Sequence, residues 1–152
     1  CLSGQDNHCA QYDLLGYRSL PGGYAEYVKV PVANLIPLPD DADLVSAAAF
    51  PLTFVTAWHM LVTKARVQPG EDVLVLAAGS GVGQAAIQLA RLHGARVFAT
   101  AGTDEKVAKA RELGAHAVIN HRTHDFSEEI KKLDSAKPAA AKPAAPTKPP
   151  GQ

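Results

Sequence analysis

The sequence contains little cysteine and no excess of either charge. Two of its 152 residues are cysteine, Cys1 and Cys9, and both lie in a polar opening segment. Lysine and arginine together number 15, as do aspartate and glutamate, so the formal net charge is zero. A neutral chain gives no general electrostatic reason to expect nucleic acid or an anionic membrane as a partner.

Long apolar runs and the pattern of a secretion signal are also missing. No uninterrupted apolar stretch has the length of a membrane span, and the opening residues do not combine a basic region with an apolar one. We therefore expect a cytoplasmic protein with no membrane partner. The length suits one ordinary domain and the hydrophobic content of 47% suits a globular protein.

The last part of the chain has no apolar residue larger than alanine. Residues 134–152, DSAKPAAAKPAAPTKPPGQ, are rich in proline, alanine and lysine. Such a segment buries too little surface to offset its conformational entropy, so we expect a disordered tail with polyproline II character. The alternative is a basic arm for nucleic acid, but Lys137, Lys142 and Lys148 supply few charges for phosphate contacts.

What the sequence does contain is a strand followed by a glycine-rich turn and a helix. Residues 73–78, VLVLAA, predict a strand buried on both faces of a parallel sheet. Gly79, Ser80, Gly81 and Gly83 follow at once, and from Val82 onward apolar residues recur at helical spacing. Backbone N–H groups at such a turn bind phosphate because glycine permits close approach and the helix N-terminus is partly positive.

The pattern then repeats along the chain. Gly94 predicts the end of the first helix, and residues 96–101 predict a second strand. Residues 104–113 predict a second helix, stopped by Gly114, and residues 116–120 a third strand. This order predicts an α/β fold, namely half of a Rossmann domain with three parallel strands.

The two cysteines do not make a metal site by themselves. Structural zinc takes four ligands, and His8 is a poor third because it adjoins Cys9. A disulfide is also sterically conceivable, although spaced cysteines in a reducing compartment more often bind metal. We interpret Cys1 and Cys9 as half of a larger cysteine set.

These segments together resemble the medium-chain dehydrogenase/reductase family, which includes zinc-type alcohol dehydrogenases and quinone oxidoreductases. Cys1 and Cys9 have the spacing of the last two cysteines of that family's structural zinc lobe. Residues 22–28, GGYAEYV, resemble its GG-x-AEY strand, residues 31–39 resemble the strand that leaves its GroES-like domain, and the helix SAAAFPLTFVTAWHML continues the match. The resemblance implies the end of a GroES-like β domain at 1–45, the first half of a Rossmann domain at 46–133 and the tail at 134–152.

The resemblance also limits the chemistry. Members with a catalytic zinc place a cysteine ligand four residues before a threonine, and here Leu52 precedes Thr56. The sequence therefore resembles members that transfer hydride without a metal, and no catalytic residue is assigned. His59 lies on an apolar helix, where a packed histidine is the more common role.

The family's glycine motif falls on Ala78, Ser80 and Gly83, so two of its three positions carry other small residues. The implied cofactor is NADP(H) rather than NAD(H), because the second strand ends at Ala101 without the acidic residue that binds the ribose in NAD-specific domains. The implied cofactor-binding residues are Thr56, Gly79, Ser80, Gly81, Val82, Gly83, Gly102, Thr103, Lys106 and His121. Structural zinc is implied for a longer parent protein.

Two classes of function follow. The first is an NADP(H)-dependent oxidoreductase acting on a small carbonyl or quinone, which we expect to be inactive as this chain because the family's substrate domain and later strands are not in it. The second is a non-catalytic nucleotide-binding or structural fragment. In either case the first strand should have an unpaired edge, through which the chain could form homo-oligomers.

Overall fold

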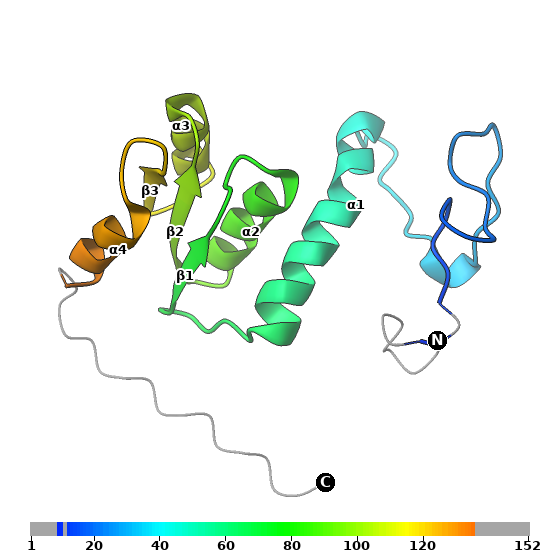
Figure 1. The fold of residues 1–152 in the computed structure, drawn as a ribbon. Coiled ribbons are helices and arrows are strands. Elements are labelled where there is room, and N and C mark those ends of the chain that lie inside the picture. The colour runs from blue at the N-terminus through cyan, green and yellow to red at the C-terminus, as the bar shows by residue number, and fades with distance from the viewer. Residues whose placement is uncertain (1–8, 11, 136–152) are drawn as a thin grey trace, which may run out of the picture. The chain divides into compact units, whose positions relative to one another are not determined.

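The computed structural model describes residues 9–10 and 12–135 (Figure 1). Cys1 and residues 136–152 of the expected tail lie outside the described residues, while Asp134 and Ser135, expected to begin that disordered tail, form the end of a helix instead. The chain divides into two units between Ala42 and Asp43, and each unit is described here by itself. The helices and strands are η2 (Val32–Asn34), α1 (Leu44–Trp58), η3 (His59–Lys64), β1 (Asp72–Val75), α2 (Gly81–Leu92), β2 (Arg96–Ala101), α3 (Asp104–Glu112), β3 (Ala117–Asn120) and α4 (Phe126–Ser135).

The first unit has one short 3-10 helix, η2, and no strand among its described residues. The expected strands at 22–28 and 31–39 are not formed there, and Tyr24 and Tyr27 are 108% and 90% exposed. Its order comes from short-range bonds, such as the main-chain bond from Gly16 N–H to the Leu20 carbonyl and the acceptance by the Asp13 carboxylate of the Ser19 hydroxyl. An extended segment becomes a strand only when another strand pairs with it.

The second unit contains a three-stranded parallel sheet in the order β1-β2-β3, as the sequence predicts (Figure 1). Asp72 pairs with Arg96, and Ala99 of β2 pairs with Val118 of β3. The register of β1 and β2 is fixed by a bidentate contact in which the Arg96 guanidinium donates to both Asp72 carboxylate oxygens at 2.8 Å. This connectivity is that of a mononucleotide-binding half of a Rossmann fold.

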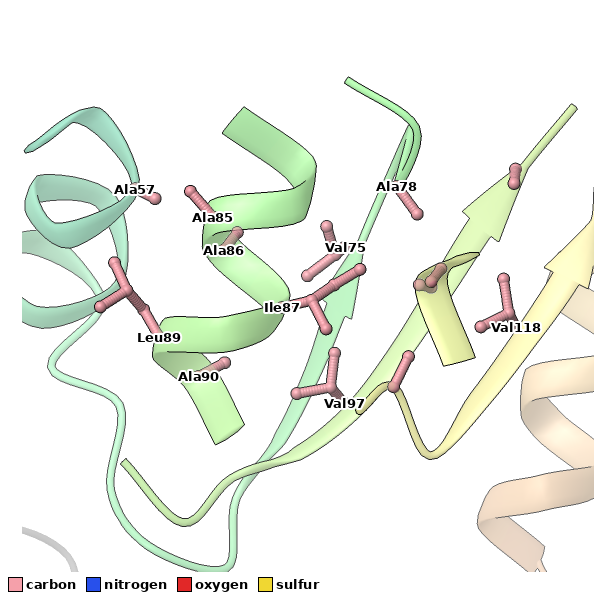
Figure 2. Close-up of a cluster of buried hydrophobic side chains, with 14 of the residues drawn as sticks. Ala57, Val75, Ala78, Ala85, Ala86, Ile87, Leu89, Ala90, Val97 and Val118 are labelled. Carbon is pink, nitrogen blue, oxygen red and sulfur yellow. The ribbon is translucent and has the colours of Figure 1, made fainter. Parts of the chain in front are cut away.

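One face of the sheet is covered by α2 and α3. Figure 2 shows Ile87 of α2 lying between Val75 and Val97, with Val118 of β3 in the same cluster. Ile87 is fully buried, and Val107 and Ala110 of α3 belong to this core. The helices end as the sequence predicts, because Gly94 and Gly114 have φ of 76° and 99°, which favour glycine.

The opposite face of the sheet is partly open at β1. Leu74, whose register partner is Phe98, is 44% exposed, and Leu76 beyond the strand is 59% exposed. The expectation that residues 73–78 are buried on both faces is therefore wrong. The strand also ends earlier, at Val75, because Ala77 has a φ of 54° that no extended strand can accommodate.

The helix before the sheet is longer and less regular than expected. Asp43 caps α1 by accepting from the N–H groups of Val45 and Ser46, and the helix continues beyond Trp58 as the π-helical turns of η3. Residues Leu44–Lys64 are long and apolar enough to cross a membrane, which corrects the expectation that no segment has this character. One such helix is weak evidence for a membrane, and α1 packs against α2.

Candidate nucleotide-binding site

The candidate site lies where the three strands end. Parallel strands point the same way, so the segments after β1, β2 and β3 meet at one edge of the sheet. Ligands of open α/β sheets bind beyond the carboxyl ends of the strands. The candidate residues at this edge of the sheet are those of the glycine turn, Gly102 and Thr103, and His121.

Close packing forces the glycine turn into its shape. A Cβ on Gly83 would lie 2.4 Å from the carbonyl oxygen of Ala77, so a side chain at this position would displace backbone. Ser80 is the N-cap of α2, and its Oγ accepts from the Gly83 N–H at 3.0 Å. The last glycine of the motif is therefore required for the helix to start this close to the strand, and Ser80 stabilises that start.

The turn presents hydrogen-bond donors to an anion. Within the described part of the chain, the backbone N–H groups of Gly81 and Val82 at the start of α2 have no acceptor. Gln84 donates from its side chain to the Gly79 carbonyl at 3.3 Å, so this oxygen already has a donor. The Ser80 hydroxyl keeps its own proton to donate, so the arrangement fits a pyrophosphate.

Lys106 meets the glycine turn from α3. A Cβ on Gly79 would lie 2.7 Å from the Cδ atom of Lys106, so the aliphatic part of this side chain crosses Gly79. Thr103 caps α3 by accepting from the Lys106 N–H at 3.3 Å. The structure thus brings together Gly79, Thr103 and Lys106, which the sequence placed in one site from two separate turns.

A second group of residues meets at Gly102. A Cβ on Gly102 would lie 3.4 Å from the His121 ring and 3.5 Å from Nε of Arg122. The sequence analysis includes His121 among the cofactor-binding residues but not Arg122. Its proximity to Gly102 depends on contact between the ends of β2 and β3, which no short motif reveals. The His121 imidazole and the Arg122 guanidinium group therefore lie at the same edge of the sheet as Lys106.

The first turn of α3 also carries acidic residues, and the carboxylate of one of them, Asp104, already accepts a hydrogen bond. Asp104 Oδ1 accepts from the Asn120 side chain at 2.8 Å, while Asn120 Oδ1 accepts from the Arg122 N–H at 3.1 Å. This contact connects the start of α3 to the end of β3.

Thr56 is bonded within its own helix rather than to the glycine turn. Its hydroxyl donates to the Leu52 carbonyl of the same helix at 2.7 Å. Thr53, one turn earlier in α1, lies against the glycine turn, since a Cβ on Gly81 would be 2.9 Å from its Cγ2 atom. Thr53 is a site residue that the sequence analysis missed, and only the packing of α1 on α2 reveals it.

The described residues offer no metal centre. In the part of the chain that the structure describes, no group of three or more His, Cys, Asp or Glu residues could hold a metal ion. Cys9 is half-buried and free of a disulfide, and Cys1 lies outside the described residues. The described residues alone therefore do not complete a zinc site.

Comparison with known families places both ends of the chain in dehydrogenase families. Residues 81–141 match the family described as zinc-binding dehydrogenase, and residues 1–40 match the alcohol dehydrogenase GroES-like domain. The quinone oxidoreductase of Homo sapiens is 40% identical over 114 residues, which is 75% of this chain and 35% of that protein. The quinone oxidoreductase of Mus musculus is 38% identical over 115 residues, which is 76% of this chain and 35% of that protein.

Solved structures give the same result. An NAD-dependent alcohol dehydrogenase is 52% identical with a TM-score of 0.84, covering 91% of this chain and 40% of that chain. The quinone oxidoreductase of Thermus thermophilus, solved also in complex with NADPH, is 41% identical with a TM-score of 0.69. The match covers 76% of this chain and 38% of that chain. The chain thus spans about a third of the length of the curated quinone oxidoreductases it matches.

Proposed function

The chain belongs to the medium-chain dehydrogenase/reductase family, and from this premise we propose that it provides part of the NADP(H) site of an oxidoreductase. The proposed reaction is hydride transfer to or from a small carbonyl or quinone substrate. The observation that carries the proposal is the contact of Lys106 with Gly79. It places a lysine side chain beside a turn with free backbone donors.

The residues have separate tasks in this proposal. The N–H groups of Gly81 and Val82 and the Ser80 hydroxyl bind the pyrophosphate. The 2′-phosphate and its ribose lie at Gly102, Thr103, Lys106 and His121, and Thr56 lies beside the nicotinamide. The nicotinamide ring, when bound, supplies or accepts the hydride. No catalytic acid or base is assigned among the described residues, and structural zinc at Cys1 and Cys9 is proposed only for a longer parent protein.

The residues after β2 favour NADP(H) over NAD(H). The two solved relatives differ, since one is an NAD-dependent alcohol dehydrogenase and the other was solved in complex with NADPH. In this chain β2 ends at Ala101, so no carboxylate at its end accepts from the ribose or repels a 2′-phosphate. His121 and Arg122 lie at Gly102, directly after that strand end, and Lys106 in the first turn of α3 lies across Gly79.

The proposal extends to partners and location. The relatives are named as enzymes that act on small molecules, so we propose a small-molecule substrate and a cytoplasmic location. We propose neither nucleic acid nor a membrane as partner. Self-association is proposed through the edge of β1, where Leu74 and Leu76 are exposed.

Competitive titration with NADPH and NADH tests the cofactor. A charge-assisted phosphate contact contributes about 1.5–3 kcal/mol, so we expect NADPH to bind more than about tenfold tighter. Lys106→Ala should remove most of this preference. Lys109→Ala is the matched control, because Lys109 is exposed on the same helix and should leave the preference unchanged. Equal or tighter binding of NADH by the unchanged chain would refute the proposal.

A further inference from the structure

The side chain of Asn120 connects two segments that border the proposed 2′-phosphate position. Its Nδ2 donates to Asp104 at the start of α3, and its Oδ1 accepts from the Arg122 N–H. The two bonds fix the orientation of the amide, because the reverse orientation would set an amide oxygen against a carboxylate and an NH2 group against an N–H. Asn120 is therefore held between one acidic and one basic residue.

The first bond determines where the Asp104 carboxylate points. Asp104 and Asn120 line one groove of about 380 Å³ on the β3 side of α3, together with Val118 and Arg111. Lys106, two residues further along the helix, instead lies across Gly79. The acidic and basic side chains of this helical turn thus point to different sides, and Asn120 holds the acidic one away from the glycine turn.

The second bond shapes the turn that carries the basic residue. The Asn120 main-chain carbonyl accepts from the N–H groups of Thr123 and His124 at 3.2 and 3.0 Å, and its side chain accepts from the N–H of Arg122 at 3.1 Å. These bonds close the chain into a tight turn directly after β3. The turn sets Arg122 beside Gly102, with Nε 3.5 Å from the position of a Cβ there.

We propose that Asn120 is a positioning residue for cofactor choice, which makes the site selective for a 2′-phosphate by holding Asp104 away from it and Arg122 toward it. The inference rests on the proposed NADP(H) site. Asn120 itself contacts neither phosphate nor ribose in this account. It acts by keeping a carboxylate away from the position of the 2′-phosphate and a guanidinium group beside that position, since an unrestrained carboxylate there would repel the ligand.

The probes are 2′,5′-ADP and 5′-AMP, which differ by the 2′-phosphate alone, and their affinities for the full chain are measured by calorimetry. Asn120→Ala should weaken 2′,5′-ADP by roughly threefold to tenfold and leave 5′-AMP nearly unchanged, with a larger effect at low salt. Asp104→Asn added to Asn120→Ala should restore most of the loss. Thr123→Ala is the control in the same turn, since among the described residues its hydroxyl bonds only to the Asn120 carbonyl and the His124 ring.

The outcomes separate the inference from the proposed function. If the unchanged chain binds both probes equally, the NADP(H) proposal fails and the inference fails with it. If the unchanged chain prefers 2′,5′-ADP and Asn120→Ala weakens both probes equally, or neither, Asn120 is merely structural and the inference alone is overturned.

If Asn120→Ala does not fold, a second variant tests whether Asn120 holds the Asp104 carboxylate away from the phosphate. Asp104→Asn alone keeps a partner for the Asn120 amide, and should change 2′,5′-ADP affinity by less than about twofold, because the carboxylate is already held away. A gain of about tenfold or more would mean that the Asp104 carboxylate faces the phosphate, and would overturn the inference.

Discussion

Residues 12–42 and residues 72–120 lie largely within the parts of the chain that two dehydrogenase family models match, yet only the second stretch forms a core. The described residues up to Ala42 include none that is buried, and their main-chain bonds are short-range, such as Tyr17 N–H to the Leu14 carbonyl. In the second stretch Ile87 and Val97 are fully buried and three strands pair in register. The difference lies in the strands available for pairing. Each β-α-β segment contains a second strand that pairs with the first, whereas the described residues of the GroES-like segment form no strand.

The comparison shows that matching a family's sequence pattern is not sufficient to form the corresponding structure. A strand pattern such as GGYAEYV forms no sheet without a pairing strand, however well it matches. The glycine turn, by contrast, is supported by α1, α2, α3 and Thr100 of β2. We therefore expect substitutions to have large effects in the second stretch and small ones in the first.

The largest contrast should come from one substitution made in each stretch. Gly83→Ala places a Cβ 2.4 Å from the Ala77 carbonyl oxygen, and such overpacking costs about 1–3 kcal/mol. For a domain of this size we expect a fall in Tm of roughly 10 °C and loss of nucleotide binding. Gly23→Ala is the matched change, since nothing lies within 4 Å of its Cβ position. Comparable losses in thermal melts of the two variants would remove the contrast.

The next effect concerns the open side of β1. Leu74→Lys places a charge beside the unpaired edge and should reduce self-association, because edge lysines oppose strand pairing. Sedimentation velocity at increasing concentration measures it. Leu92→Lys is the control, as Leu92 is 78% exposed at the end of α2. If both lysine variants reduce association equally, general solubility rather than the β1 edge is responsible.

A smaller effect separates the two roles of Ser80. Ser80→Ala removes the cap of α2 and should cost about 1 kcal/mol, seen in denaturant unfolding. Ser80→Asp keeps the cap but brings a carboxylate to the pyrophosphate, so stability should persist while NADPH affinity falls about tenfold. Unchanged NADPH affinity in Ser80→Asp would mean that the phosphate does not lie at this turn.

The smallest effect is the pH dependence of α1. The Ser46 hydroxyl and the N–H groups of Val45 and Ser46 donate to Asp43 and hold the pKa of its carboxyl below the ordinary 3.8. A lowered folded-state pKa stabilises the helix fully above the unfolded value, and this stabilisation is lost as pH falls through the lowered one. Circular dichroism from pH 5 to 2 should show less loss of helix in Asp43→Asn, whose cap does not titrate. Identical titrations of the two proteins would contradict this origin.

The sequence predicts most of the second unit because its signals are local. The apolar segments together with Gly94 and Gly114 define α2, β2, α3 and β3 to within about two residues, whereas β1 ends earlier than predicted and α4 was not predicted. Contacts between distant segments were not predictable, among them Arg122 at Gly102 and the Asn120 amide on Asp104, 16 positions apart. The early end of β1 was not predictable for another reason, since the positive φ of Ala77 is a strained choice for a residue other than glycine.

Amide chemical-shift mapping during titration with NADPH tests the central claim most directly, namely that the carboxyl ends of β1, β2 and β3 form one nucleotide site. The account predicts saturable shifts at Gly79, Gly81, Gly102 and Arg122, with residues 12–42 unaffected. NADH should shift the glycine turn but affect Gly102 and Arg122 less. Saturable shifts confined to another part of the chain, or none at the three strand ends, would contradict the account.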